Sequence, residues 1–252
     1  MRLILAEDYD DLSDRAARLL ADAIATNPGL AFIPATGDTP MGAYARLAEI
    51  VAAEGIDATG LRVFQLDEYL GLPPGDRRLL AGWMERSLIR PLGIPAERVV
   101  CFDSAAPDPD ATCAAWDAAL ADAGGADLVV LGLGPNGHLG FNEPPAERDA
   151  PTRVITLTDE SIRSNGPYWG GEEFVPRRAV TAGMAPLLAA RQVILLVSGE
   201  RKHGILHRAL AGEVTPEVPG SWLQTVPNAM VIADRAAWGD LPVPAALAGD
   251  DR

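Results

Sequence analysis

The sequence contains little cysteine and no long apolar run. Its two cysteines, Cys101 and Cys113, are too few for a disulfide framework or a cysteine-rich metal cluster. No apolar run approaches the roughly 20 residues that are needed to span a bilayer. The N-terminus reaches acidic residues by position 7, which is not typical of a secretory signal. We therefore expect a cytoplasmic protein with no membrane partner.

Basic residues are also scarce, with 21 lysines and arginines against 35 acidic residues and a formal net charge of -14. This charge argues against nucleic acid and anionic membrane surfaces as partners. It also means that an anionic substrate must be bound by locally placed cations and backbone amides. Lys202 is the only lysine, since every other basic residue is an arginine.

What the sequence does contain is a regular alternation of apolar runs and helical periodicity. Strands are predicted at 2–6, 30–35, 61–66, 126–133, 153–157, 192–198 and 229–233, and helices at 9–26, 41–53, 77–90, 110–123, 182–190 and 203–211. This alternation predicts an α/β fold with a mostly parallel sheet and helices on both faces. We expect one domain over residues 1–240, a frayed tail over 241–252, and a mobile connection or lid over 159–180.

The loop after the predicted strand 126–133 is the most informative segment. Gly132, Gly134 and Gly137 match a dinucleotide-binding fingerprint formally, but the prolines that follow leave no room for the crossover helix that such a site needs. We therefore reject a nucleotide site and expect the glycines to let the backbone approach a ligand. His138 in this loop can shuttle a proton at neutral pH, and Glu143 can fix its tautomer or stabilise the imidazolium.

Two adjacent carboxylates follow the predicted strand 61–66. Neighbouring residues of an extended chain point to opposite sides, so one of Asp67 and Glu68 can face the crevice while the other faces protein. A carboxylate at that position is suited to proton abstraction. The alternative for either residue is a helix cap or a solvated loop.

Two strand-to-helix junctions have the character of anion sites. The first is the segment Thr36–Thr39, where backbone amides and hydroxyls lie at a helix N-terminus. Lys202 occupies the equivalent place after a later strand. Together they predict a phosphorylated small molecule as the ligand. His203 and His207 are four residues apart, but without a third ligand nearby we expect no metal site.

These motifs together resemble the glucosamine-6-phosphate deaminase (isomerase) family, which includes galactosamine-6-phosphate enzymes. The resemblance spans about residues 1–236 and is carried by the segments Ala35–Pro40, Leu66–Pro73, Leu131–Pro144 and Ser198–Lys202. It implies a Rossmann-like three-layer sandwich and no metal or nucleotide cofactor. The implied reaction converts glucosamine 6-phosphate and water to fructose 6-phosphate and ammonia.

The resemblance also implies roles for individual residues. Asp67 corresponds to the base that removes the C2 proton, and His138 corresponds to the group that opens the sugar ring, supported by Asn136 and Glu143. The residues implied in binding the substrate or its phosphate are Thr36, Gly37, Asp38, Thr39, Gly134 and Lys202.

Several positions depart from the family pattern. Asn136 stands where some members have aspartate, so Glu143 becomes the main ionic partner of the imidazole. Asp38 stands where many members have glycine, and an aspartate repels a phosphate unless it points away. Pro167 stands where many members have a phosphate-binding arginine, for which we expect Arg163 to substitute. Ile155 matches an effector-binding lysine of allosteric members, so we expect no such allostery.

Three alternatives remain open at this point. Galactosamine 6-phosphate, giving tagatose 6-phosphate, is the first. The second is a hydrolase of the 6-phosphogluconolactonase type, which shares the fold and the glycine–histidine loop but does not require a C2 base. The third is a non-catalytic sugar-phosphate sensor, which usually accompanies a DNA-binding segment that this acidic chain does not offer. Either a monomer or a homo-oligomer is compatible with the sequence.

Overall fold

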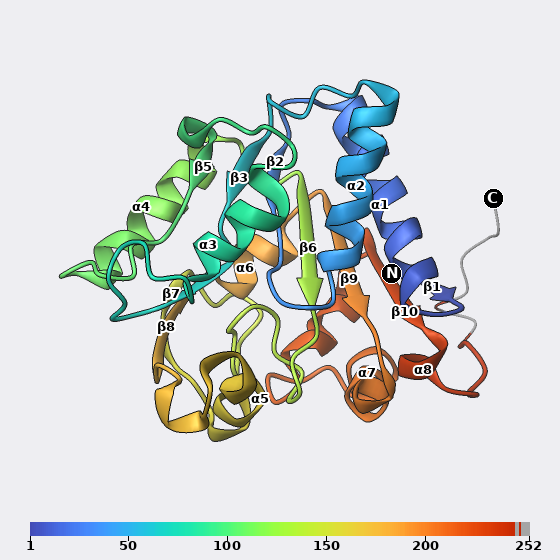
Figure 1. Ribbon diagram of the computed structural model, residues 1–252. Coiled ribbons are helices and arrows are strands. Elements are labelled where there is room, and N and C mark those ends of the chain that lie inside the picture. Colours follow the sequence, from blue (N-terminus) through green and yellow to red (C-terminus); the bar gives the residue numbers. More distant parts are fainter. Residues whose placement is uncertain (245–246, 248–252) are drawn as a thin grey trace.

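A seven-stranded parallel sheet forms the centre of the protein, as a computed structural model shows for residues 1–244 and 247 (Figure 1). The strand order is β1-β10-β9-β6-β2-β3-β5, and each neighbouring pair runs parallel. The bounds of these strands are β1 (Arg2–Ala6), β2 (Ala31–Ile33), β3 (Arg62–Phe64), β5 (Val99–Val100), β6 (Leu128–Gly132), β9 (Gln192–Val197) and β10 (Ala229–Asp234).

Helices flank this sheet, which confirms the predicted α/β architecture (Figure 1). They are α1 (Tyr9–Thr26), α2 (Met41–Glu54), α4 (Pro109–Asp122), α6 (Met184–Leu188), α7 (His203–Ala211) and α8 (Arg235–Trp238). The long helix α1 follows directly from its sequence. Asp8 caps it by accepting from the Asp11 backbone amide, and Leu12, Leu20 and Ile24 lie on its fully buried face. No helix among the described residues is long and apolar enough to cross a membrane.

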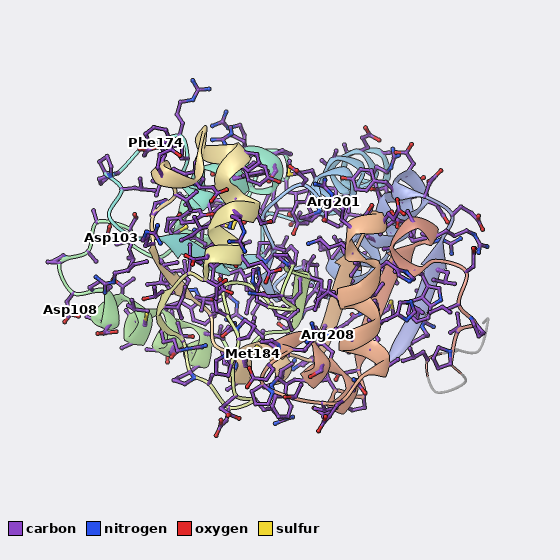
Figure 2. All side chains as sticks on the ribbon, turned by 90° about the horizontal axis from the view of Figure 1, so that it is seen from below. Asp103, Asp108, Phe174, Met184, Arg201 and Arg208 are labelled. Atoms are coloured by element: carbon purple, nitrogen blue, oxygen red, sulfur yellow. The ribbon has the colours of Figure 1, made fainter. Side chains whose placement is uncertain are left out.

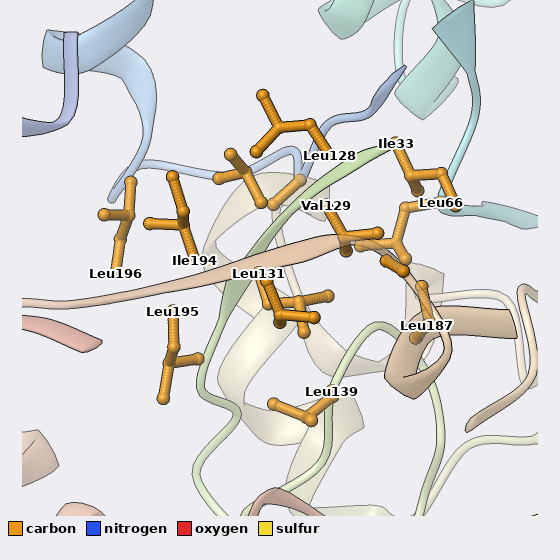
Figure 3. Close-up of a cluster of buried hydrophobic side chains, with 14 of the residues drawn as sticks. Ile33, Leu66, Leu128, Val129, Leu131, Leu139, Leu187, Ile194, Leu195 and Leu196 are labelled. Atoms are coloured by element: carbon orange, nitrogen blue, oxygen red, sulfur yellow. The ribbon is translucent and has the colours of Figure 1, made fainter. Parts of the chain in front are cut away.

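The core is centred on the two middle strands β6 and β9. Leu131 of β6 lies beside its register partner Leu195 of β9 on one face, Ile194 points to the opposite face, and all three side chains are almost completely buried (Figure 3). Both faces of these strands are covered, which is why they read as continuous apolar runs in the sequence. The two strands are parallel neighbours, so their carboxyl ends open at the same edge of the sheet.

A second, three-stranded sheet was not predicted. It joins β4 (Asp67–Tyr69), β8 (Arg178–Thr181) and β7 (Arg153–Thr156) by antiparallel pairing. Its small separate core includes Tyr69 and Trp169. The expectation of one mostly parallel sheet was therefore incomplete. A three-residue strand that carries two acids has no apolar signal, so only the tertiary partner β8 reveals it.

The predicted lid segment 159–180 is largely regular structure. It forms α5 (Asp159–Trp169), a 3-10 turn (Glu172–Phe174) and most of β8. Thr158 caps α5 by accepting from the Ser161 backbone amide, and Pro167 is tolerated inside the last turn. No helix or strand was predicted over this segment, because Pro167 and the glycines within it disfavour regular structure, yet α5 includes the proline two residues before its end. Movement of this segment stays a prediction.

Two other predicted boundaries also changed. The predicted helix 77–90 is a shorter α3 (Leu80–Met84) that continues into a π-helical turn (Glu85–Ile89). Of the tail that was predicted to fray, residues 245, 246 and 248–252 lie outside the described residues.

Candidate active site

A cavity of about 370 Å³ lies where the loops after β2, β3 and β6 meet α5 and the turn before α7. Figure 2 views the molecule from the end toward which β6 and β9 point in Figure 1, with α5 and α7 on either side of the centre. Of the catalytic and substrate-binding residues that the family resemblance implied, all line this cavity except Asn136 and Glu143, which lie behind His138. The loops after the parallel strands thus bring together site residues that are spread over 167 positions of the sequence, from Thr36 to Lys202.

Asp67 presents an unpaired carboxylate to the cavity. It lies at the start of β4, opposite Thr181 of β8, and its exposed fraction is only 6 %. Among the residues that the structure describes, none donates a hydrogen bond to this carboxylate. Burial, followed by the nearby charge of Glu68, raises the pKa of Asp67 to about 8. A carboxylate whose charge is so poorly stabilised is a strong proton acceptor.

Glu68 faces the opposite way and caps α3. Its carboxylate accepts hydrogen bonds from Gln65 Nε2 at 2.8 Å and from the backbone amides of Tyr69, Leu80 and Ala81 at 2.9, 3.0 and 2.9 Å. Burial raises its pKa, although these hydrogen bonds oppose the shift. The two adjacent carboxylates therefore divide as the alternation of an extended chain predicts, with Asp67 toward the cavity and Glu68 toward protein.

His138 lies directly against the backbone of Gly134. A Cβ added to Gly134 would meet the imidazole ring at 2.2 Å, so the glycine is needed for the histidine itself to approach the backbone. Nδ1 lies 3.4 Å from Glu143 Oε2 and 3.3 Å from Ser161 Oγ. With Nδ1 engaged in this way, Nε2 is the ring nitrogen available to a ligand in the cavity. The segment after the loop contains no crossover helix, as predicted.

Glu143 is held by a network that orients the imidazole. It accepts from Asn136 Nδ2 at 2.7 Å, from the Thr158 backbone amide at 3.2 Å and from Thr158 Oγ1 at 3.1 Å. Burial alone raises the pKa of Glu143, but His138, Ser161 and Asn136 together lower it to about 2. The carboxylate thus stays ionised beside the histidine.

The contribution of α5 to this network was missed in the sequence. Thr158 and Ser161 form the first turn of α5, and Ser161 is fully buried. Their spacing is typical of a helix cap, which was the available signal. It does not reveal that the same two side chains also contact Glu143 and His138.

The predicted anion-binding loop Thr36–Thr39 lies across the cavity beside the start of α2. Gly37 adopts a φ of +96°, a left-handed conformation that favours glycine. The Asp38 carboxylate turns toward α5, where it accepts a 2.6 Å hydrogen bond from the Tyr168 hydroxyl. Lys202 approaches from the 3-10 turn between β9 and α7, and its Nζ donates to the Leu133 carbonyl at 2.6 Å. Burial, followed by the charge of Arg201, lowers the pKa of Lys202.

Arginines that were not predicted line the rim of the cavity. Arg77 and Arg78 reach it from the segment before α3, and Arg86 reaches it from the π-helical turn that follows α3. Arg78 also binds Asp76 and lies over the ring of Trp169 at 4.8 Å.

The expectation that Arg163 replaces the lid arginine was wrong, because its side chain is exposed and does not line the cavity. It points outward since the inner side of that turn is occupied by buried Ser161 and Ile162.

An aromatic wall closes one side of the cavity. Tyr69 packs against Trp169 with ring centroids 5.0 Å apart and against Phe141 at 5.2 Å. All three side chains line the cavity and are largely buried. Such a wall excludes water from the region next to Asp67 and strengthens electrostatic interactions there.

Within the described part of the chain, no three histidine, cysteine or acidic side chains are close enough together to hold a metal ion. His203 and His207 contact each other edge to face, with ring centroids 4.6 Å apart. His207 Nε2 lies 2.8 Å from the Trp238 carbonyl, so this pair joins α7 to α8.

Comparison with known proteins assigns the chain to a defined family. Residues 6–232 match the family model described as glucosamine-6-phosphate isomerases/6-phosphogluconolactonase. The chain is 37 % identical over 237 residues to a glucosamine-6-phosphate deaminase of Halothermothrix orenii, covering 94 % of this chain and 98 % of that protein. It is 39 % identical over 241 residues to one of Cutibacterium acnes, covering 94 % of this chain and 91 % of the other.

Solved structures agree with this similarity. A monomeric glucosamine-6-phosphate deaminase superposes with a TM-score of 0.91 at 30 % identity, covering 94 % of this chain and 98 % of that chain. A 6-phosphogluconolactonase from Trypanosoma brucei superposes with a TM-score of 0.76 at 21 % identity, covering 96 % and 98 %, and so shares the fold. The chain belongs to the family of glucosamine-6-phosphate isomerases and 6-phosphogluconolactonases.

Proposed function

We propose that the protein is a glucosamine-6-phosphate deaminase, which converts glucosamine 6-phosphate and water to fructose 6-phosphate and ammonia. The observation that carries the proposal is the buried, unpaired Asp67 carboxylate in the same cavity as His138 and Lys202. A C2 base is needed for this reaction and is not needed to hydrolyse a lactone. The similarity to curated deaminases along most of the chain supports the same choice.

Ring opening is the first step of the reaction. Nε2 of His138 takes the proton of the sugar's O1 hydroxyl and returns a proton to the ring oxygen as the C1–O5 bond breaks, which leaves the open-chain aldehyde. Glu143 carries a negative charge at 3.4 Å from Nδ1 and stabilises the imidazolium that forms in between. Asn136 and Thr158 keep this carboxylate in place.

Proton transfer between C2 and C1 follows. Asp67 removes the C2 proton while O1 takes a proton from the sugar's C2 ammonium group, and the electron pair of the broken C2–H bond forms the enolamine double bond between C1 and C2. Protonation of C1 then yields a ketimine at C2. Water adds to that carbon, and ammonia leaves to give the ketone. The reactive form of Asp67 is the carboxylate, which is restored when the residue delivers the proton to C1.

The phosphate group is bound at the other end of the cavity. The Lys202 ammonium and the Thr36–Thr39 loop supply the charge and the donors that a phosphate needs. The rim arginines Arg77 and Arg86 raise the local concentration of anions in a protein whose net charge is -14. Fixing the phosphate orients C2 toward Asp67.

The test is ammonia release from glucosamine 6-phosphate and galactosamine 6-phosphate in parallel, with 6-phosphogluconolactone hydrolysis as the third assay. Faster release from glucosamine 6-phosphate supports the proposal, and faster release from its C4 epimer assigns the other amino sugar. Lactone hydrolysis without ammonia from either sugar rejects deamination. Asp67→Asn serves as the control, because any release that it retains at the wild-type rate does not depend on the proposed base.

A further inference from the structure

Tyr168, near the end of α5, joins three elements around the mouth of the cavity. Its hydroxyl donates a 2.6 Å hydrogen bond to Asp38 Oδ2 in the loop before α2. Its ring lies 5.7 Å from the ring of Trp83 in α3, at an interplanar angle of 68°. Trp83 Nε1 in turn lies 2.9 Å from Met41 Sδ at the start of α2. Tyr168, Asp38 and Trp83 all line the cavity, although the tyrosine is 49 % exposed.

The Asp38 carboxylate belongs to the loop that we propose binds a phosphate, although both groups are negatively charged. Its neighbours Thr36, Gly37 and Thr39 form the loop that we propose binds a phosphate, and like charges a few ångströms apart repel each other. The carboxylate is exposed on the α5 side, where the Tyr168 hydroxyl holds one of its oxygens. Without that hydrogen bond, rotation about χ1 brings the same carboxylate toward the phosphate side of the loop.

The Tyr168 hydroxyl is well suited to hold the Asp38 carboxylate by a hydrogen bond. Burial, followed by the hydrogen bond and the charge of Asp38, raises the pKa of Tyr168 to about 12. The hydroxyl therefore remains a protonated donor over the whole neutral pH range. The contact with Trp83 fixes the ring independently of the hydroxyl, so removal of the hydroxyl alone leaves the packing of α5 in place.

We propose that Tyr168 is a positioning residue for the anion site, whose hydroxyl directs the Asp38 carboxylate away from the phosphate-binding side of the Thr36–Thr39 loop. In this way a residue of α5 sets the affinity for phosphorylated ligands without touching the reacting atoms. The inference rests on the proposed function only in assigning a phosphate to this loop and Lys202.

The test is a double-mutant cycle read out by calorimetric titration with inorganic phosphate. Tyr168→Phe keeps the ring and should raise the Kd for phosphate about fivefold, which is the size of one ordinary hydrogen bond, because both partners are partly exposed to solvent. Asp38→Asn removes the charge and should bind phosphate at least as tightly as the wild type. In the Asp38→Asn background, Tyr168→Phe should change the Kd by less than about twofold. For glucosamine 6-phosphate the same pattern should appear in KM, and the effect of Tyr168→Phe should fall on KM rather than on kcat.

Tyr9→Phe is the matched control. The Tyr9 hydroxyl donates to the Asp38 backbone carbonyl at 3.0 Å and accepts from the Gly42 amide at 2.9 Å, so it supports the loop without touching the carboxylate. Its effect on phosphate binding should be the same with and without Asp38→Asn.

Two results overturn the inference. The first is an effect of Tyr168→Phe that is absent, or equal in both backgrounds, since the hydroxyl then does not act through the Asp38 charge. The second is a wild type that binds no phosphate, even if it releases ammonia. The expected coupling in a protein that releases no ammonia keeps the inference and rejects the proposed activity instead.

Discussion

Replacing Asp67 with asparagine should abolish turnover and at the same time stabilise the fold. The carboxylate is buried, and no donor among the described residues contacts it. Burial and then Glu68 raise its pKa from 3.8 to about 8, so the folded protein resists its ionisation. Asparagine has nearly the same shape and no charge. The same property that makes Asp67 a good proton acceptor therefore makes it costly to the fold.

The size of the stability gain expected for Asp67→Asn follows from the linkage between ionisation and folding. A carboxyl whose pKa is raised on folding destabilises the protein above its unfolded pKa, and this effect grows until the pH passes the folded pKa. With pKa values of 3.8 and about 8, the cost is about 4 kcal/mol at pH 7 and about 2 kcal/mol at pH 5.5. Relaxation of the interior reduces such costs, so we expect Asp67→Asn to gain about 2 kcal/mol at pH 7. For a chain of this length, that gain raises Tm by about 4–8 °C.

The assay is thermal and urea unfolding of the two proteins at pH 7 and at pH 5.5, where the gain should fall by about half. Glu68→Gln is the control, because its carboxylate accepts four hydrogen bonds and an amide nitrogen cannot replace an acceptor. It should lose about 2 kcal/mol although it neutralises the adjacent charge. A variant Asp67→Asn that is less stable than the wild type at pH 7, or equally stabilised at both pH values, refutes the reasoning.

Three further predictions concern the residues around this base. Gly134→Ala should displace the His138 ring, destabilise the protein by about 1–3 kcal/mol and reduce kcat. Gly132→Ala is the control, because its added Cβ meets nothing within 4 Å, and it should leave the unfolding temperature and kcat close to wild type. Equal effects of the two substitutions would contradict this prediction. Glu143→Gln should lower kcat on the order of 100-fold with little change in KM, measured by ammonia release, because the imidazolium loses its ionic partner. Lys202→Gln should raise KM for the phosphorylated sugar about tenfold, and it should raise the inhibition constant of inorganic phosphate by a similar factor. An unchanged KM would show that Lys202 does not bind the phosphate.

Much of the fold could be predicted from the sequence because its signals are local. The apolar runs around β6, β9 and β10 reflect strands buried on both faces, and the spacing of Leu12, Leu20 and Ile24 reflects one face of α1. The loop with His138 was equally visible, since glycines and prolines constrain the backbone of their own segment. Asp67 could be placed at a strand end because the apolar run 61–66 stops directly before it.

The rest could not be predicted because it depends on distant partners. The short strand β4 exists only through its pairing with β8, which lies more than 100 residues away. Thr158 and Ser161 look like an ordinary helix cap, and only the return of α5 toward the sheet places them against Glu143 and His138. The rim arginines resemble surface residues in a chain that uses arginine throughout.

The sequence by itself determined the alternation of strands and helices, the glycine loop around His138 and the residue types available for the chemistry. Only the tertiary structure decided which of these side chains meet and how their charges are stabilised. It buries Asp67 with no hydrogen-bond donor from the residues that the structure describes, and it turns Asp38 toward Tyr168, its partner 130 positions along the chain. The physical reason is that periodicity and turn chemistry act between neighbours in sequence. Burial, and the pKa values that follow from it, depend on everything that packs around a side chain.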